Sequence, residues 1–274
     1  MSMTKEMTSG KPYKLILSFA IPLILGNVFQ QLYNMVDTVI VGKFVGVNAL
    51  AGVGSTGAIN FLVIGFALGI CSGFSIMIAQ RFGAGDYSGM RKFIANSIYL
   101  CIAVAVILTA VTMLLTKPIL TVMNTPKEIY DYAYNYIIII FAGISATMFY
   151  NILSGILRAV GDSRTPLIFL GVSSVLNVGL DLLCIIVFKM GVAGAGIATV
   201  ISQAISAFLC LIYIRKNYDI LRFEHDEFKF EAHRAKRLVS VGIPMALQFS
   251  ITAIGSIIPV SYTHLRAHET LSDL

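Results

Sequence analysis

The sequence contains few charged residues for its length, and this scarcity decides its class. Only 12% of the 274 residues are Asp, Glu, Lys or Arg, whereas 57% are hydrophobic. A soluble domain carries about 25% charged and about 45–50% apolar residues. A soluble chain of this composition could not cover its own surface with polar groups. The composition therefore excludes an ordinary soluble domain and favours a protein that is solvated by lipid.

Charges are missing from long continuous stretches, each of which is long enough for a helix to cross about 30 Å of hydrocarbon. Backbone polar groups in lipid must be satisfied internally, and continuous apolar runs differ from the short alternating segments of barrel strands. We therefore predict an all-α integral membrane fold. The first run is too long for a signal-peptide core, so we expect it to be retained. The predicted spans are approximately 15–41, 49–80, 93–116, 130–157, 165–188 and 192–214.

Cysteine and histidine are scarce or lie in the wrong places for an active site. The cysteines all fall in hydrophobic runs and form no Cys-x-x-Cys pair, so we expect them to pack in the core. The histidines all follow the sixth predicted span, which leaves no histidine for a metal or nucleophile site within the membrane. We therefore predict a protein that is not an enzyme and has no cofactor beyond a coupling ion. The residues concerned are Cys71, Cys101, Cys184, Cys210, His225, His233, His264 and His268.

The net charge of +6 follows from topology and does not indicate a nucleic-acid partner. With the amino terminus in the cytoplasm, fifteen basic residues fall in inner segments and four fall in outer loops. Basic residues favour the cytoplasmic side of a membrane protein. We therefore predict a multi-pass protein whose amino terminus and segments 81–92, 158–164 and 215–237 are cytoplasmic. The four outer residues are Lys43, Lys117, Lys127 and Lys189.

A short internal repeat predicts a second lobe. Residues 17–25 read LSFAIPLIL and residues 239–247 read VSVGIPMAL, and each segment follows a basic cytoplasmic stretch. Six spans separate the two copies, so both have the same orientation, as in transporters built from parallel repeats. We expect an amino-terminal six-helix lobe at 1–214, a cytoplasmic linker at 215–237, and the first span of a second lobe at 238–259. That arrangement is half of a twelve-span, two-lobe transporter.

The carboxyl-terminal segment differs from the rest of the chain. After Pro259 the sequence reads VSYTHLRAHETLSDL, where His, Arg and Glu interrupt the apolar pattern of a span. We expect residues 260–274 to be a non-native tail on a truncated sequence, and we give them no functional role.

Ionisable residues are rare within the predicted spans, and the exceptions predict a cation site. A carboxylate in the hydrocarbon region costs about 2.5–3.5 kcal/mol, so it usually faces a cavity or a partner. Asp37 and Asp181 lie in the outer halves of their spans; Asn177 precedes Asp181 by four residues and shares its helix face. With Thr199 at similar depth, these groups could bind Na⁺ or share a proton. Alternatively, Asp37 lies among lipid headgroups and Asp181 satisfies a helix terminus.

Two further residues could serve transport. Pro22 lies inside the first predicted span, where it removes a backbone hydrogen bond and favours a kink. It is a candidate hinge, although proline is common in such helices. Tyr136 belongs to an aromatic cluster at an outer boundary, which is typical of an interfacial belt. It alone of that cluster is deep enough to be a candidate for lining a cavity.

Four segments in combination resemble the multidrug and toxic compound extrusion (MATE) family, in particular its bacterial DNA-damage-inducible-like branch. The resemblance covers residues 14 to about 259. It implies a bacterial inner-membrane antiporter with twelve spans that exports cationic or amphipathic compounds in exchange for H⁺ or Na⁺. It also implies that Asp37, Asn177, Asp181 and Thr199 form the cation site, and Tyr136 matches less closely. The segments are IPLILGNVFQQLYNMVDTVIVG (21–42), AQRFGAGDYSGMRK (79–92), GILRAVGDSRTPL (155–167) and NVGLD with GAGIATVISQ (177–203).

Three alternatives remain: a lipid or polysaccharide flippase of the same superfamily, a membrane enzyme, and an assembly subunit without transport. A flippase would favour basic residues in its cavity to bind phosphates, and we expect no Lys or Arg well inside the spans. The expected substrate is therefore an organic cation, and the expected partners of the lobe are the lipid bilayer and the second lobe of the full-length chain. The buried carboxylates argue against an assembly subunit.

Overall fold

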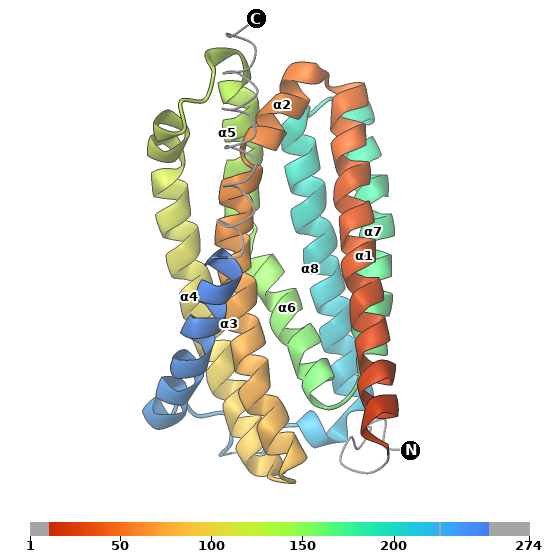
Figure 1. The fold of residues 1–274 in the computed structure, drawn as a ribbon, viewed down its shortest axis with the longest axis vertical. Helices are drawn as coiled ribbons and strands as arrows, with labels where there is room; N and C mark the ends of the chain where they lie inside the picture. The colour runs from red at the N-terminus through yellow and green to blue at the C-terminus, as the bar shows by residue number, and fades with distance from the viewer. Residues whose placement is uncertain (1–10, 225, 252–274) are drawn as a thin grey trace, which may run out of the picture.

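The computed structural model describes residues 11–224 and 226–251, and within these ranges it is helical without strands (Figure 1). The segments 1–10, 252–274 and residue 225, with the predicted non-native tail and the end of the seventh span, lie outside the described residues. Residues 232–251 form a further helix after the named elements. The elements are α1 (Pro12–Phe44), α2 (Val47–Ser55), α3 (Gly57–Gly83), α4 (Tyr87–Val122), α5 (Lys127–Ala142), α6 (Ile144–Ala159), α7 (Arg164–Leu182), the π-helix η1 (Leu183–Val187), α8 (Val192–Asn217) and the 3₁₀ helix η2 (Asp219–Leu221).

The predicted spans coincide with helices, but two of them are broken. Five helices of the described chain are long and apolar enough to cross a membrane, or six if the bent pair α5 and α6 is one span. The helix predicted over 130–157 bends by 46° between α5 and α6. The span predicted over 49–80 is divided at Thr56, where α2 ends and α3 begins. Hydropathy detects apolar length, which both broken segments have, and it does not detect a bend.

Two loops at the same end of the bundle contain the same turn, in which a glycine is followed by an aspartate. Gly85 and Gly161 both have positive φ (70° and 89°), a conformation that glycine adopts without strain. Asp86 then accepts a hydrogen bond from the backbone N–H of Gly89 (2.8 Å) and begins α4. Asp162 likewise accepts from the backbone N–H groups that begin α7, at distances of 3.1 and 3.0 Å. These hydrogen bonds satisfy backbone N–H groups at the start of each helix, which would otherwise lack a partner.

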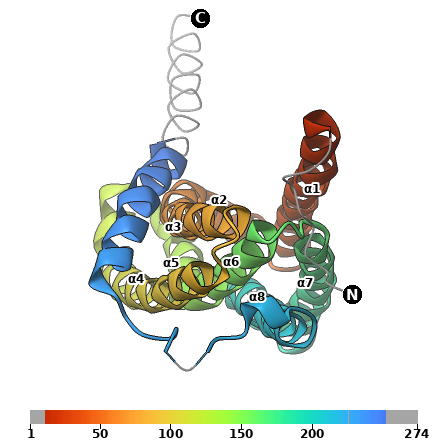
Figure 2. The ribbon, with the colours of Figure 1, turned by 90° about the horizontal axis from the view of Figure 1, so that it is seen from below.

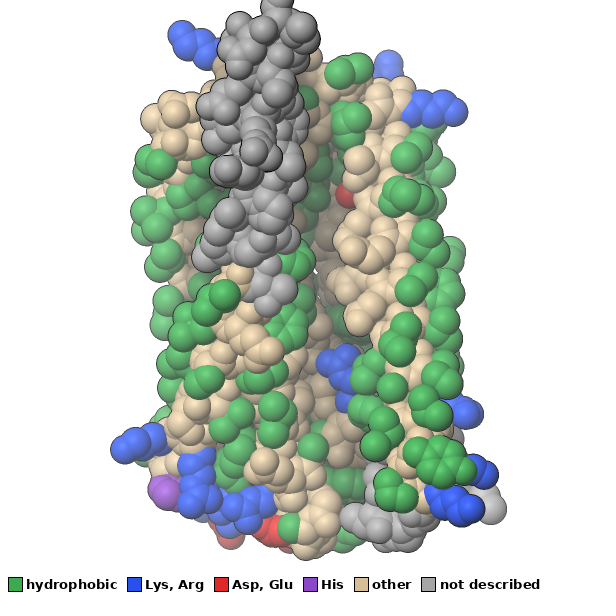
Figure 3. All heavy atoms as spheres, viewed as in Figure 1, with side chains coloured by type: hydrophobic (Ala, Val, Ile, Leu, Met, Phe, Trp, Pro, Cys, Tyr) green, Lys and Arg blue, Asp and Glu red, His purple; other side chains and the backbone are tan. Residues whose placement is uncertain are grey.

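The helices form an elongated bundle with two sides (Figures 1 and 2). On one side α3 packs against α4 and α6, and on the other side α7 packs against α1 and α8. Helix α6 also contacts α8 and so joins the two sides. A hollow lies beside α1 in the space-filling view (Figure 3). The lobe is therefore hollowed on the face that α1 borders.

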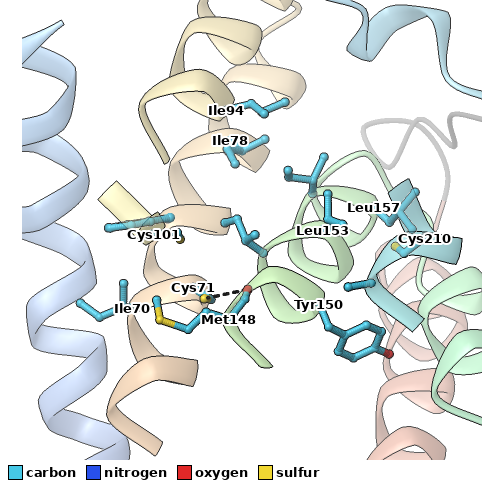
Figure 4. Packing of buried hydrophobic residues seen from close by; sticks show 14 of the residues in the cluster. Ile70, Cys71, Ile78, Ile94, Cys101, Met148, Tyr150, Leu153, Leu157 and Cys210 are labelled. Atoms are coloured by element: carbon cyan, nitrogen blue, oxygen red, sulfur yellow. Dashed lines mark hydrogen bonds between the residues drawn. The ribbon is translucent and has the colours of Figure 1, made fainter. Parts of the chain in front are cut away.

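The main core contains cysteines that act as small hydrophobic residues. The Sγ of Cys71 lies 3.7 Å from the carbonyl oxygen of Met148, and Figure 4 shows Ile70 beside this contact. All four cysteines are buried and free, which agrees with the packing role expected from their positions. This cluster packs side chains of α3, α4, α6 and α8 against one another.

The helix at 232–251 crosses α3 at very short range. A Cβ added at Gly69 would lie 2.4 Å from the Cα of Ala246, and one added at Gly73 would lie 2.6 Å from the Cα of Gly242. Two pairs of small residues, each spaced four apart, therefore face each other, as is common between membrane helices. This helix contains the second copy of the internal repeat, and it begins earlier than the predicted start at 238.

The connection between α8 and this helix is docked onto the start of α4. Arg91 binds the carboxylate of Glu227 through Nε and Nη2, with Nη2 2.8 Å from Oε1, and its Nη1 reaches the carbonyl oxygen of Ile220 (3.3 Å). Asn96 donates to the carbonyl of Lys229 (3.3 Å) and accepts from the N–H of Glu231 (2.8 Å). The predicted linker is therefore held against α4 by hydrogen bonds, and apart from the end of α8 and the 3₁₀ helix η2 it contains little helix before residue 232.

Candidate functional site

Two buried carboxyl groups from different helices meet inside the lobe. Asp37 of α1 is 6% exposed, and Asp181 in the last turn of α7 is fully buried. Their side chains lie within hydrogen-bonding range of each other. One oxygen of each, Oδ1, has no hydrogen-bond partner among the described residues. Two neighbouring carboxyl groups repel each other when both are ionised, and a shared proton or a bound cation would relieve that repulsion.

Asn177 and Thr199 complete the polar wall beside Asp181. In the orientation that satisfies both ends of its amide, Asn177 donates to Asp181 Oδ2 (3.0 Å) and accepts from the backbone N–H of Thr199 (3.3 Å). Asn177 is fully buried on the face of α7 that also carries Asp181, one turn later. The structure thus brings together the four residues Asp37, Asn177, Asp181 and Thr199; their role in coupling stays a prediction.

Two tyrosines border the carboxyl pair, and the sequence analysis named only one of them. Tyr136 of α5 is 8% exposed and interacts electrostatically with Asp37 and Asp181. Tyr33 of α1 was missed, although its hydroxyl donates a hydrogen bond to Thr199 Oγ1 (3.2 Å). The signal was available: Tyr33 precedes Asp37 by four residues and so shares its helix face. Tyr33 links α1 to α8 directly beside the carboxyl group that α1 contributes.

An irregular turn of helix follows the carboxyl pair. Helix α7 ends at Leu182, one residue after Asp181, and the chain continues as the π-helix η1. It then turns through Lys189 (φ 53°) and Gly191 (φ 59°) into α8. π-helical turns widen the helix locally and are frequent at functional sites. This geometry places Asp181 next to a discontinuity of the span.

A separate cavity of about 100 Å³ lies between α1, α6, α7 and α8. Its wall includes Pro22, Asn27 and Gln30 of α1, and Arg158 of α6. The expectation that no Lys or Arg lies well inside the spans is therefore wrong. Arg158 was assigned to a cytoplasmic loop because of its sequence position, but α6 extends to Ala159 and directs this side chain into the cavity. Figure 3 shows basic atoms within the hollow beside α1.

Pro22 borders this cavity from within α1, and the helix continues on both sides of it. Proline lacks the N–H group that would bond to the preceding turn, so α1 is weakened there. The structure thus places the candidate hinge about four turns from Asp37, on the same helix. Motion at Pro22 would move α1 relative to α7, and that would change the contact between the two carboxyl groups.

The chemistry of the first site favours a small hard cation or a proton. Its ligating atoms are carboxylate, amide and hydroxyl oxygens, which suit Na⁺ better than a transition metal. Within the described residues, no group of three or more His, Cys, Asp or Glu side chains could hold a metal ion. The second site, around Arg158, offers positive charge and amide groups. The lobe therefore presents groups of opposite character at two positions along α1.

Comparison with known proteins places the chain among membrane transporters. The MatE family model matches residues 22–183. The chain is 32% identical over 251 residues to "Probable multidrug resistance protein YpnP" of Bacillus subtilis, covering 91% of this chain and 56% of that protein. It is 30% identical over 253 residues to "Probable multidrug resistance protein NorM" of Thermotoga maritima, covering 88% of this chain and 53% of that protein. The chain thus spans about half the length of these relatives.

Solved structures of similar fold support the same placement. A transporter of the MOP superfamily from Pyrococcus furiosus, described as having a binding pocket of reverse polarity, superposes with a TM-score of 0.85 at 27% identity, covering 94% of this chain and 57% of that one. An outward-facing multidrug resistance transporter of the same superfamily superposes with a TM-score of 0.84 at 28% identity, covering 90% of this chain and 55% of that one. These relatives are transporters and not enzymes.

Proposed function

Because the chain belongs to the MATE family, we propose that it forms the amino-terminal lobe of a secondary antiporter. In this proposal, amphipathic compounds, including organic cations, leave the cell in exchange for H⁺ or Na⁺. The observation that carries the proposal is the contact between two buried carboxyl groups, Asp37 and Asp181, on separate membrane helices. Relatives named as multidrug resistance and export proteins support the drug-export part.

The carboxyl pair is the proposed coupling site. When the site lacks a cation, repulsion between Asp37 and Asp181 favours separation of α1 from α7; a proton or Na⁺ removes that repulsion. A ligand can shift a conformational balance only through different affinities for the two shapes. The cation thus favours one shape of the lobe, and the exported compound favours the other. Pro22 provides the place where α1 bends, and relatives solved in a "bent" and in a "straight" conformation are consistent with such a hinge.

A second lobe is the proposed partner of this one. The relatives extend well beyond the matched region, since the chain covers 56% and 58% of two of them. The helix at 232–251 carries the repeated segment and leaves the six-span lobe against α3. We place the lobe in the bacterial cytoplasmic membrane with its amino terminus inside, on the strength of the basic-residue asymmetry. Alternating access then results from movement between two such lobes.

Flux in proteoliposomes tests this proposal. The chain is reconstituted together with the carboxyl-terminal half of a relative such as YpnP, and transport of an organic cation is followed with an imposed pH or Na⁺ gradient. We expect one gradient to drive uphill transport, Asp181→Asn to abolish it, and Asp37→Asn to weaken it severely, with membrane insertion unchanged. If both variants still move substrate uphill with the wild-type gradient dependence, the coupling site is wrong.

A second candidate function is a flippase for an anionic lipid or polysaccharide precursor. The specific observation in its favour is Arg158 in the cavity wall, because phosphate groups are commonly bound by arginine. The Pyrococcus furiosus relative, whose pocket of reverse polarity is described as suggesting a different function, is consistent with that alternative. Translocation of a fluorescent phosphatidylglycerol in the same vesicles, independent of any ion gradient, would favour the flippase.

A further inference from the structure

Arg158 lies in the last turn of α6, one residue before the helix ends, and its side chain lines the cavity between α1, α6 and α8. A basic side chain in a membrane bundle is costly unless it reaches a partner, water or a functional site. The position is therefore informative in the same way as that of the buried carboxyl groups.

No carboxylate of the described chain compensates this charge, since its ion pairs do not include Arg158. Asp162, the next acidic residue along the chain, forms its hydrogen bonds with other groups. Its Oδ1 accepts from the N–H groups that begin α7, and its Oδ2 accepts from the hydroxyl of Tyr218 (2.7 Å). The guanidinium of Arg158 thus faces the cavity without a fixed anion from the described part of the chain.

The rest of the cavity wall is polar on several sides. Asn27 and Gln30 of α1, Asn151 and Ser154 of α6, and Gln203 of α8 all border it. Gln203 is 9% exposed, and its Oε1 has no hydrogen-bond partner among the described residues. Amide and hydroxyl groups can rotate to donate hydrogen bonds to a ligand oxygen. A buried acceptor without a partner is itself unfavourable and indicates that something else completes the site.

We infer that Arg158 anchors an anion subsite, which binds one carboxylate, sulfonate or phosphate group of an amphipathic compound. The planar guanidinium forms paired hydrogen bonds with such groups. A volume of about 100 Å³ holds a head group, whereas a whole drug-sized molecule fills a pocket of roughly 300–1,000 Å³. The apolar remainder of the compound extends past Leu23 and Leu170 towards the open face. That this compound is the exported one rests on the proposed function, whereas the binding itself does not.

Two matched ligands test the subsite: naphthalene-1-acetate, which is anionic, and naphthalene-1-acetamide, which has nearly the same shape without charge. The chain has no tryptophan, so Leu23→Trp creates a single reporter in the cavity wall. Quenching of its fluorescence by each ligand is measured in detergent without an ion gradient. We expect the acid to bind about tenfold or more tightly than the amide. Arg158→Gln should remove that preference, and Arg158→Lys should retain part of it.

Controls separate this inference from the proposed coupling. Asp181→Asn should leave the preference for the acid unchanged, even where it abolishes transport. If Arg158→Gln fails to fold, the ratio of the two affinities in the Leu23→Trp protein still decides the question. Equal affinity for acid and amide there, or a preference that persists in folded Arg158→Gln, would overturn the subsite.

The source of the anion is distinguished by repeating the titration in nanodiscs. In phosphatidylcholine, whose headgroup is zwitterionic, a soluble ligand should bind as in detergent. If phosphatidylglycerol abolishes binding of the acid in proportion to its mole fraction, a lipid headgroup occupies the subsite. Either result supports an anion subsite at Arg158. Binding that is unaffected by lipid and equal for both ligands contradicts it.

Discussion

At the residue scale, the hydroxyl groups of Tyr33 and Thr199 form a hydrogen bond beside the carboxyl pair. Tyr33 donates to Thr199 Oγ1 and holds α1 against α8 near Asp37. A net hydrogen bond contributes about 0.5–1.5 kcal/mol. Losing it should therefore loosen the site without unfolding the lobe.

We expect Tyr33→Phe to weaken binding of the coupling cation about fivefold, while expression and melting temperature change little. Tyr13→Phe is the matched control, because Tyr13 lies on the same helix and is 57% exposed. Equilibrium titration of the purified protein with H⁺ and with Na⁺ measures the effect. Equal affinities in Tyr33→Phe and wild type would show that the link to Thr199 does not shape the site.

Glu227, in the connection after α8, should contribute to the stability of the folded protein in a way that depends on pH. The hydrogen bonds from Arg91 lower the pKa of this carboxyl group from its ordinary 4.5 to about 2. A depressed pKa stabilises the folded state above the unfolded value, and that contribution is lost as the pH falls through about 2. Between pH 7 and pH 5 the carboxylate is ionised in the folded protein.

Glu227→Gln should therefore lower the melting temperature by the same amount at pH 7 and at pH 5. Asp226→Asn is the control, since Asp226 is exposed and forms an ion pair with Lys229 in the same loop. A destabilisation by Glu227→Gln that disappears at pH 5 would contradict the lowered pKa.

At the element scale, the close crossing of α3 and the 232–251 helix depends on residues without large side chains. Because backbone atoms of Ala246 and Gly242 lie within 3 Å of the positions a Cβ would take, no side chain can be accommodated without separating the helices. Overpacking in a core costs about 1–3 kcal/mol.

We predict that Gly69→Leu and Gly73→Leu each lower the melting temperature by several degrees and detach the 232–251 helix from α3. Gly171→Leu in α7 is the control, because nothing lies within 4 Å of its added Cβ. Cross-linking between cysteines placed on the two helices reports detachment. Unchanged cross-linking in both variants would mean that this crossing is not tightly packed.

The elements show what the sequence could predict and what it could not. Charge-free length located the spans, because lipid exposure requires apolar residues over the whole crossing. It did not locate the break at Thr56 or the bend between α5 and α6, since both halves remain apolar. Arg158 was misplaced because a basic residue near a predicted boundary looks like a topology signal. Asp37 and Asp181 were singled out because charge is rare in a span, and their helices bring them together.

At the scale of the whole molecule, the predicted orientation rests on the basic residues: fourteen lie in predicted inner segments once Arg158 is left out, and four lie in outer loops. We predict that a cysteine replacing Arg222, in the connection after α8, is labelled by a membrane-impermeant reagent only from the cytoplasmic side. A cysteine replacing Lys127, at the start of α5, should be labelled only from outside. The background is a variant in which the four native cysteines, all buried, are replaced. Labelling of position 222 from outside would reverse the topology.

The organisation of the lobe gives α1 a central role in the proposed mechanism. It carries Asp37, the hydroxyl of Tyr33 and the candidate hinge Pro22, and it borders the cavity that contains Arg158. Most of its other surface is exposed and apolar, which suits contact with lipid. In the proposed mechanism, α1 therefore responds to the cation near Asp37 and to the exported compound near Pro22, and different affinities for the two shapes of the lobe couple these events.

The central claim is that Asp37 and Asp181 form one cation-binding unit, and infrared difference spectroscopy tests it most directly. In the absence of Na⁺ at neutral pH, the purified chain should show the C=O stretch of a protonated carboxyl group, because two carboxyl groups in contact share a proton. We predict that this band is lost in Asp37→Asn, in Asp181→Asn, or when Na⁺ displaces the proton. If the spectra of the wild type and both variants are identical across the neutral range, with and without Na⁺, the two aspartates do not act as a unit.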